Sequence, residues 1–199
     1  MTAQKTTVGV GFSAERFPAG THMCLVYRDE ASRRRIVAKF VESGIAEDER
    51  VYYFADTPTP SDVADWLAGL DVDLSDAIAS HELSMDQALS TYCPDGTFDP
   101  TRMCNAVRNA YSASQDEGYA HARVTGEMTW ALRGLPGSDL LMTYEAAVND
   151  VVKTHPITAM CQYDANRFDG ETIFDALRVH PYMVMNGQLV RNPYFAVEE

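Results

Sequence analysis

Short apolar runs alternate along this chain with longer stretches of helical period, and this alternation limits the possible fold more than any other feature. Runs that suit buried strands occupy residues 23–27, 50–54, 120–127 and 157–163, and a weaker run covers 83–85. Between them, apolar residues recur every three or four positions, as they do on one face of a helix. The alternation predicts a three-layer α/β fold, in which a mostly parallel central sheet carries helices on both faces.

Cap residues predict where the helices begin and end. Helix starts are expected at Asp29, within the segment 57–61, at Asp99 followed by Pro100, and at Ser138. Gly44 is placed as the stop of the first helix, and the helix after Asp99 is expected to end before Gly118. In the later helices, Leu141 and Tyr144 are expected on the apolar stripe of one, and Ile173 and Phe174 are expected to belong to the next.

The C-terminal segment predicts a closing hairpin. Residues 182–185 and 188–191 flank Asn186-Gly187, which favours a primed turn between two antiparallel strands. With 199 residues the chain is expected to form one domain, extending over about 20–195 behind a short N-terminal extension, 1–19.

The charge of the chain disfavours a nucleic-acid partner. The formal net charge is −13, and the single basic run is Arg33-Arg34-Arg35, inside a helical pattern. A phosphate backbone is repelled by such a surface. We interpret the arginine triplet as a solvated helix face rather than as a contact for an anion or a partner.

The sequence also predicts a cytoplasmic protein. No window is apolar over the length of a membrane span, and residues 1–11 lack the pattern of a secretory signal. Cys24, Cys93, Cys104 and Cys161 have no Cys-x-x-Cys spacing, so they are expected as free thiols in a reducing compartment.

The residues that end the predicted strands carry the functional prediction, because ligands of open α/β sheets bind beyond the carboxyl ends of the strands. The first such turn reads Tyr27-Arg28-Asp29-Glu30, with no glycine, and neither a Walker motif nor a Gly-x-Gly-x-x-Gly motif occurs elsewhere. A phosphate there would meet two carboxylates and no amide nest. Nucleotide hydrolysis by the usual route is therefore disfavoured.

Glu127 and Trp130 form the most conspicuous strand end. A carboxylate followed three residues later by an aromatic side chain supplies one polar contact beside an apolar wall, as a binding pocket requires. A capping carboxylate and a core tryptophan would account for the pattern equally well. Tyr163 and Asp164 supply further polar groups at the last core strand.

Histidines and cysteines near the strands suggest a weaker metal hypothesis. His22 and Cys24 fall on one face of a strand, Cys161 lies in another strand, and His180 precedes the last one. These four would form a tetrahedral site if their strands were adjacent. Their spacing fits no compact zinc motif, and buried cysteine is common in cores, so we favour a core role.

A set of ordered motifs resembles one known family. The motifs are His22-x-Cys24-x-x-Tyr27, Gly44-Ile45-x-x-x-Glu49, Gly126-Glu127-Met128-x-Trp130, Tyr144-Glu145 with Asn149, Cys161-x-Tyr163-Asp164, His180-Pro181 and Asn192-Pro193-Tyr194. Together they resemble the DcmR-type sensory domain, also called MEDS for methanogen/methylotroph DcmR sensory, over roughly residues 20–195.

The resemblance implies a RecA- or KaiC-like core without the Walker A loop, and a role in sensing small hydrocarbon derivatives to regulate transcription or signalling. Members of the family often carry a helix-turn-helix or histidine-kinase-like module as well. This chain has no room for either, so its output is expected to pass through a separate protein partner or through self-association.

We therefore expect a stand-alone sensory domain that binds a small, largely apolar organic effector, and neither an enzyme nor a cofactor-dependent protein. The expected ligand-binding residues are His22, Cys24, Tyr27, Glu127, Trp130, Cys161, Tyr163 and Asp164. Two alternatives stay open. One is an enzyme with a degenerate nucleotide site, using Glu127 and Asp164 on magnesium and phosphate. The other is an interaction module of a kinase or anti-sigma system that binds no ligand.

Overall fold

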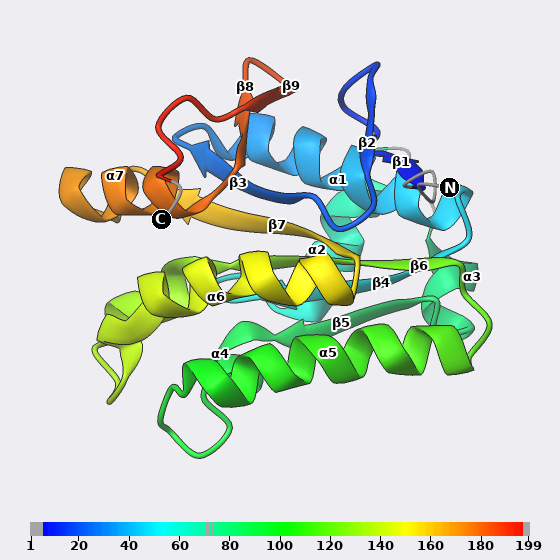
Figure 1. The fold of residues 1–199 in the computed structure, drawn as a ribbon. Coiled ribbons are helices and arrows are strands. Elements are labelled where there is room, and N and C mark those ends of the chain that lie inside the picture. Colours follow the sequence, from blue (N-terminus) through cyan, green and yellow to red (C-terminus); the bar gives the residue numbers. More distant parts are fainter. Residues whose placement is uncertain (1–5, 71, 73, 197–199) are drawn as a thin grey trace, which may run out of the picture.

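The computed structural model describes residues 6–70, 72 and 74–196 and contains a seven-stranded sheet (Figure 1). The strands are β3 (His22–Tyr27), β4 (Glu49–Ala55), β5 (Leu83–Gln87), β6 (His121–Glu127), β7 (Ile157–Asp164), β8 (Tyr182–Met185) and β9 (Gln188–Arg191). Their order is β5-β4-β6-β7-β3-β8-β9, and every pair is parallel except β8 with β9. The predicted mostly parallel sheet is confirmed.

Helices cover both faces of the sheet, which confirms the three predicted layers. One face carries α1 (Glu30–Ala46), α2 (Pro60–Ala68) and α3 (Ser75–Ala79). The other face carries α4 (Ala88–Tyr92), α5 (Pro100–Asp116), α6 (Leu141–Thr154) and α7 (Gly170–Val179). In Figure 1, α5 and α6 run side by side along this second face.

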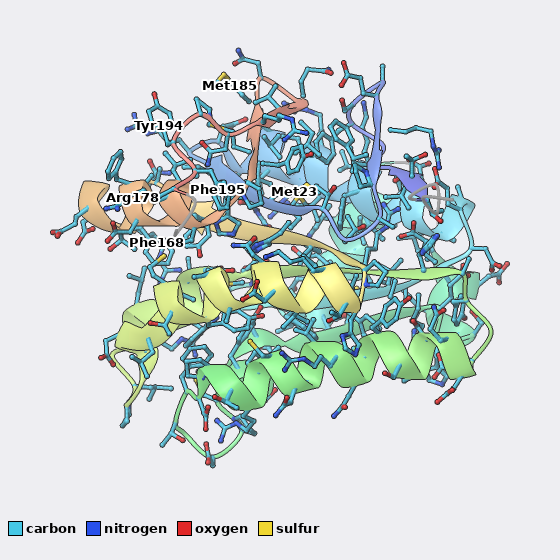
Figure 2. All side chains as sticks on the ribbon, viewed as in Figure 1. Met23, Phe168, Arg178, Met185, Tyr194 and Phe195 are labelled. Atoms are coloured by element: carbon cyan, nitrogen blue, oxygen red, sulfur yellow. The ribbon has the colours of Figure 1, made fainter. Side chains whose placement is uncertain are left out.

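The central strands are rich in apolar residues because they are buried on both faces, although several buried polar and charged side chains interrupt them. Successive residues of β7 alternate between two cores: Met160 packs with α1 and α2, whereas Ile157, Cys161 and Tyr163 pack with α5 and α6. Figure 2 shows side chains filling the space on either side of the sheet, while Met185 and Tyr194 point outward.

Most of the predicted helix starts are confirmed at their caps. The Asp29 carboxylate accepts from the Ser32 amide at 2.8 Å, Thr59 and Asp62 form a reciprocal capping box, and Asp99 caps the helix that begins at Pro100. In the C-terminal hairpin, Asn186 and Gly187 have φ of 51° and 71°, as a type I′ turn requires.

Two local predictions were wrong. Gly44 lies inside α1, which ends at Ala46; a Cβ at Gly44 would lie 2.6 Å from the Arg123 side chain, so the glycine makes room for that buried arginine. Ser138 begins a short 3-10 turn, and α6 starts at Leu141 without a side-chain cap. Ile173 and Phe174 do belong to a helix, α7, as predicted; within it Ala176 is fully buried and Phe174 is 51% exposed.

The predicted N-terminal extension is folded onto the domain from residue 6. Its strands β1 (Thr7–Gly9) and β2 (Arg16–Pro18) form an antiparallel pair that buries Val8 and Phe17. The buried Arg123, paired with Glu49 at 2.6 Å, donates to the carbonyl of Gly9 at 3.1 Å. Among the described residues, no helix combines the length and apolar character needed to cross a bilayer.

Candidate functional site

A cleft of 730 Å³ opens where β3, β4, β6 and β7 end, and we call it the strand-end cleft. Of the eight predicted ligand-binding residues, it is lined by Tyr27, Glu127 and Asp164. Its remaining lining is Glu30, Arg33, Arg34, Thr57, Pro58, Asp62, Asp65, Trp66 and Arg167. The helices that follow β3 and β7 lie on opposite faces of the sheet, so the cleft lies at a topological switch point, the place expected for a ligand.

A buried arginine lies at the floor of this cleft. Arg33 has a side chain only 2% exposed, and its Nη1 lies 3.1 Å from Glu127 Oε1 and 2.8 Å from Gln162 Oε1. The same nitrogen donates to the Tyr53 hydroxyl at 3.1 Å. We call Arg33, Tyr53, Glu127 and Gln162 the arginine network. The interpretation of the whole arginine triplet as a solvated face was therefore wrong for Arg33, although Arg34 is exposed.

The helical spacing of the buried residues of α1 already indicated that Arg33 would be buried. Position 33 precedes Val37 by four residues and Phe40 by seven, so it continues the buried stripe of α1 toward the N-terminus. A charged residue on such a stripe needs a buried partner of opposite charge. Its partner, Glu127, is 94 residues further along the chain and could not be assigned from the pattern.

Glu127 is held by donors from three sides. Its Oε1 accepts from Arg33 and from the Tyr53 hydroxyl at 3.0 Å, and its Oε2 accepts from the backbone amides of Asp56 at 3.2 Å and Thr57 at 3.3 Å. Glu127 therefore ties the end of β6 to α1 and to the loop between β4 and α2. Burial raises the pKa of Tyr53, so its hydroxyl stays protonated and donates to the carboxylate.

Trp130 does not line the strand-end cleft. Residues Met128–Arg133 form a 3-10 helix that turns the indole into the core, where it is fully buried, stacks on Tyr92 at 4.9 Å between ring centroids and packs against Phe98 at 4.7 Å. Trp130 therefore does not supply the expected apolar wall beside Glu127, and the core interpretation of the tryptophan is the one that the geometry supports.

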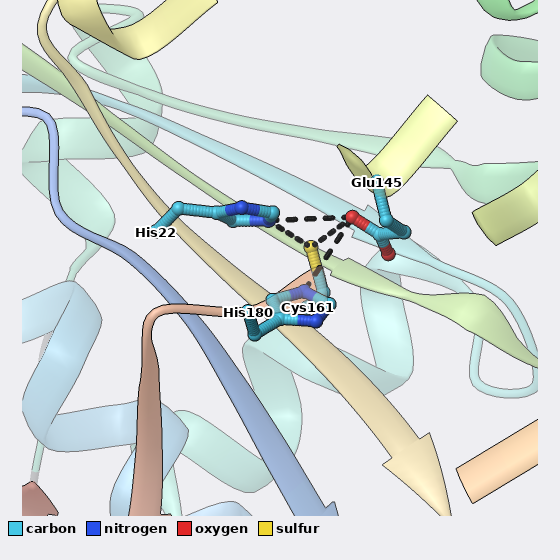
Figure 3. Close-up of side chains that lie close together, drawn as sticks. All are labelled: His22, Glu145, Cys161 and His180. Atoms are coloured by element: carbon cyan, nitrogen blue, oxygen red, sulfur yellow. Dashed lines mark hydrogen bonds and ion pairs between the residues drawn. The ribbon is translucent and has the colours of Figure 1, made fainter. Parts of the chain in front are cut away.

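A second group of polar side chains is buried on the other face of β3 and β7 (Figure 3). It contains His22 from β3, Glu145 from α6, Cys161 from β7 and His180, which follows α7. One donor atom from each lies within 4.8 Å of all the others, and all four residues are buried. We call these four residues the histidine cluster.

The histidine cluster corrects the set of ligands expected from the sequence. His22, Cys161 and His180 are brought together as that hypothesis required, but Glu145 takes the place of Cys24. The Cys24 thiol lies beside the carbonyl of Tyr182 at 3.8 Å instead. Glu145 was missed because it follows Tyr144 on the buried stripe of α6, where an apolar residue is the usual occupant.

The contacts within the cluster are short. His22 Nε2 lies 3.3 Å from Glu145 Oε2 and 3.5 Å from Cys161 Sγ, while His180 Nε2 lies 3.5 Å from the same carboxylate oxygen. The Tyr163 hydroxyl donates to Glu145 Oε1 at 2.5 Å. Tyr163, also among the expected ligand-binding residues, therefore lies beside the histidine cluster and not in the strand-end cleft.

Burial governs the protonation of these groups. It lowers the pKa of His22, an effect that the neighbouring His180 reinforces, and it raises the pKa of Cys24 to about 12 and that of Cys161 well above its ordinary value. Burial opposes ionisation of Glu145, and the neighbouring imidazoles offset it and lower the pKa of this carboxyl when they carry a proton. Both cysteines are therefore thiols beside a carboxylate, and neither has the exposed thiolate of a redox sensor.

Three comparisons with known proteins agree with this fold. The model of the family described as "MEthanogen/methylotroph, DcmR Sensory domain" (MEDS) matches residues 21–181. The chain is 23% identical over 160 residues to the transcriptional repressor DcmR of Methylorubrum extorquens (strain DSM 6343 / CIP 106787 / DM4), an alignment that covers 80% of this chain. It spans only 57% of the length of that repressor.

Two solved structures share the architecture. A KaiC-like protein of the hyperthermophilic archaeon Pyrococcus horikoshii OT3 superposes with a TM-score of 0.66 at 14% identity, covering 90% of this chain and 80% of that one. The flagellar accessory protein FlaH of Methanocaldococcus jannaschii superposes with a TM-score of 0.65 at 9% identity, covering 94% and 84%. At these identities the likeness establishes a KaiC-like, RecA-like fold and nothing about activity.

Proposed function

This chain belongs to the MEDS family of DcmR-type sensory domains, and from that premise we propose that it binds a small organic effector in the strand-end cleft and passes the signal to a separate regulatory partner, without catalysing a reaction. The observation that carries the proposal is the arginine network, which joins the ends of β4, β6 and β7 and the start of α1 beneath the cleft.

The chemistry of the cleft favours an uncharged effector over a phosphate. Five carboxylates and three guanidinium groups line it, belonging to Glu30, Asp62, Asp65, Glu127 and Asp164, and to Arg33, Arg34 and Arg167. Arg33 is already paired with Glu127 and Glu30, and Arg34 with Glu30. A polyphosphate would therefore meet an excess of negative charge and a first turn without an amide nest.

The aromatic part of the lining supports an organic molecule. Tyr27 and Trp66 supply the large apolar surfaces of the cleft, and Asp164 and Arg167 supply polar groups near them. Small-molecule sites combine such apolar surfaces with polar groups that fix the orientation of the ligand. We infer a small uncharged molecule that covers the ring of Tyr27 and makes one or two hydrogen bonds.

The arginine network supplies a route by which binding could change the protein surface. Arg33 is in the first turn of α1, and Glu127 holds the backbone of Asp56 and Thr57 before α2. An effector that contacts Tyr27 and favours one arrangement of this network shifts both segments together, provided that it binds two conformations unequally. The similarity to a transcriptional repressor favours transcriptional control as the output.

A thermal-shift screen of small uncharged organic compounds tests the proposal. Compounds that raise the Tm of the wild type are compared on Tyr27→Ala and on the matched control Tyr194→Ala, whose ring is 53% exposed and outside the cleft. We expect the shift to persist in the control and to disappear in Tyr27→Ala. A shift that survives in Tyr27→Ala would place the effector elsewhere.

A second cavity is suited to a very small apolar molecule. The same screen distinguishes binding in this cavity from binding in the strand-end cleft. It measures 50 Å³ and lies between the sheet and α5, lined by residues that include Phe54, Met103 and Val107. Ala110→Leu fills part of it. A compound whose shift is lost in Ala110→Leu but kept in Tyr27→Ala binds under α5.

Calorimetry distinguishes the two alternative functions. Titration with magnesium ATP at millimolar concentration is expected to give no binding heat. Saturable binding that is lost in Asp164→Asn would support the degenerate nucleotide enzyme instead. A screen without any hit, combined with capture of one stoichiometric protein partner, would support a pure interaction module.

A further inference from the structure

The histidine cluster takes no part in the function proposed above, because it lies on the opposite face of β7 from the arginine network. We infer that His22, Glu145, Cys161 and His180 form a binding site for one divalent transition-metal ion, of which zinc is the best match. The inference rests on the spacing of the four donor atoms, on the direction of their lone pairs and on a buried nitrogen without a partner.

The spacing is that of a tetrahedron around a metal ion. Zinc binds nitrogen and oxygen at about 2.0–2.2 Å and sulfur at about 2.3 Å, so ligand atoms at the corners of a tetrahedron lie about 3.3–3.8 Å apart. Four of the six distances between the donor atoms match it: His22 to Glu145 is 3.3 Å, His180 to Glu145 is 3.5 Å, His22 to Cys161 is 3.5 Å and Cys161 to Glu145 is 3.3 Å. All four donor atoms lie within 4.8 Å of one another. Little movement is needed to surround an ion.

Both imidazoles direct a lone pair toward the centre of the cluster. His180 Nδ1 lies 2.7 Å from the carbonyl of Ala176, which only accepts, so this nitrogen carries the proton. His22 Nδ1 lies 3.0 Å from Asn149 Oδ1, and the amide is oriented by its own Nδ2, which donates to the carbonyl of Val179 at 2.8 Å. Histidines that bind metals through Nε2 are held in this way by an acceptor at Nδ1.

Without a cation the cluster is incomplete. His180 Nε2 is fully buried and has no hydrogen-bond partner among the described residues, although it faces Glu145 Oε2 at 3.5 Å. A lone pair that faces a carboxylate oxygen in a dry interior is unfavourable unless a positive charge lies between them. A metal ion at the centre would accept both lone pairs and the carboxylate.

The charge of the site would also balance. On binding, the Cys161 thiol loses its proton to solvent as the metal–sulfur bond forms, giving a thiolate and a carboxylate around one divalent ion. Two imidazoles, a thiolate and a carboxylate suit zinc or a neighbouring transition metal. Magnesium and calcium prefer sites made entirely of oxygen, so they are poor candidates.

A cavity borders the site at the other end of the sheet from the strand-end cleft. His22 and Asn149 line a cavity of 700 Å³ beside Gly20, Pro156 and Pro181, at the amino end of β3. The side chains of His22, Glu145 and His180 are fully buried, so an ion would be captured as β3, α6, β7 and the end of α7 come together during folding.

Metal analysis and cobalt substitution of the full chain test the inference. Protein produced with zinc in the medium is expected to contain one equivalent of metal by mass spectrometry. After chelation, titration with Co²⁺ is expected to give visible bands of tetrahedral cobalt and a sulfur-to-cobalt charge-transfer band, both saturating at one equivalent. Wild-type protein that binds no Co²⁺, or binds it without the sulfur band, would overturn the inference.

Cys161→Ser and Cys24→Ser form a matched pair for this titration. The two cysteines are direct partners in the register of β3 and β7, and both are buried, but only Cys161 belongs to the cluster. We expect the sulfur band to vanish in Cys161→Ser and to persist in Cys24→Ser, and the reverse would exclude the assigned site. Circular dichroism shows whether Cys161→Ser folds. If it does not, the cobalt spectra of the wild type and of Cys24→Ser still test the assigned site.

Discussion

The two buried polar groups on either side of β7 differ in how their charges are satisfied. In the arginine network, Glu127 receives an ion pair from Arg33, a hydroxyl and two backbone amides. In the histidine cluster, Glu145 receives the hydroxyl of Tyr163 and the Cys161 thiol and faces two imidazole nitrogens. The first group contains a permanent cation, and the second contains none while its imidazoles are neutral. Two groups with similar burial therefore differ in their need for a ligand. The charge of Glu127 is satisfied within the folded protein, whereas we infer that the histidine cluster needs a bound ion.

Neighbouring residues of one strand serve the two groups. Cys161 and Tyr163 project toward the histidine cluster, and Gln162 between them projects toward the arginine network, because successive side chains of a strand point to opposite faces. Substitutions on either side of β7 can therefore test one group while the other serves as the reference.

The largest effect is expected from Arg33→Ala. The substitution leaves Glu127 buried without its ion-pair partner, a change that costs about 3–5 kcal/mol in the free energy of unfolding. Arg34→Ala is the matched control, since its side chain is 43% exposed and its pair with Glu30 contributes at most about 0.5 kcal/mol. Urea denaturation measures both. If the two substitutions lower the free energy of unfolding equally, the buried pair of Arg33 with Glu127 is no stronger than the exposed pair of Arg34 with Glu30.

Removal of metal is expected to have the next largest effect. If the ion is present at 100 times its Kd, chelation lowers the free energy of unfolding by about 2.7 kcal/mol. Chelation is expected to lower the free energy of unfolding of Arg34→Ala by the same amount. It is expected to have no effect on Glu145→Gln, because this variant lacks one metal ligand. A wild type whose stability does not respond to chelation would show that the histidine cluster is complete without an ion.

Two buried tyrosines allow a direct comparison of the two carboxylates. Tyr163→Phe removes the one described donor to Glu145 Oε1 and is expected to cost about 1.5–3 kcal/mol, as for hydrogen bonds to charged groups. Tyr53→Phe is expected to cost about 1 kcal/mol, because Glu127 keeps Arg33 and two backbone amides. Denaturation of the metal-free proteins gives both values, and the opposite order would contradict the comparison.

The smallest effect concerns pH. Burial lowers the pKa of His22 below its ordinary value of 6.5, so the unfolded chain takes up a proton near pH 6.5 that the folded chain does not. The stability of metal-free protein is therefore fully present above pH 6.5 and falls as the pH decreases below it, by at most about 1.4 kcal/mol per pH unit. Denaturation midpoints between pH 7.5 and 5 measure the slope.

The matched variants for this slope are His22→Gln and His81→Asn. His81 is exposed and has φ of 64°, a conformation that asparagine tolerates. The slope is expected to flatten in His22→Gln and to persist in His81→Asn. An unchanged slope in His22→Gln would assign the pH dependence to other groups.

Periodicity and caps determined the order of the elements because these signals are local. Asp29, Thr59 and Asp99 begin helices as predicted, and the Asn186-Gly187 turn closes the hairpin. The error at Gly44 arose from a contact across the fold, because the side chain of Arg123 needs the space at Gly44.

The sequence predicted individual residues of the site but not which of them contact one another. Tyr27, Glu127 and Asp164 were expected at strand ends, and they share a cleft because parallel strands end at one edge of a sheet. The sequence by itself determined the strands, the missing phosphate loop and the family pattern, all of which depend on neighbours in the chain. Tertiary structure alone decided that Trp130 turns inward, that Arg33 meets Glu127, and that Glu145 joins two histidines and a cysteine, since each pairing depends on distances between segments that are remote in sequence.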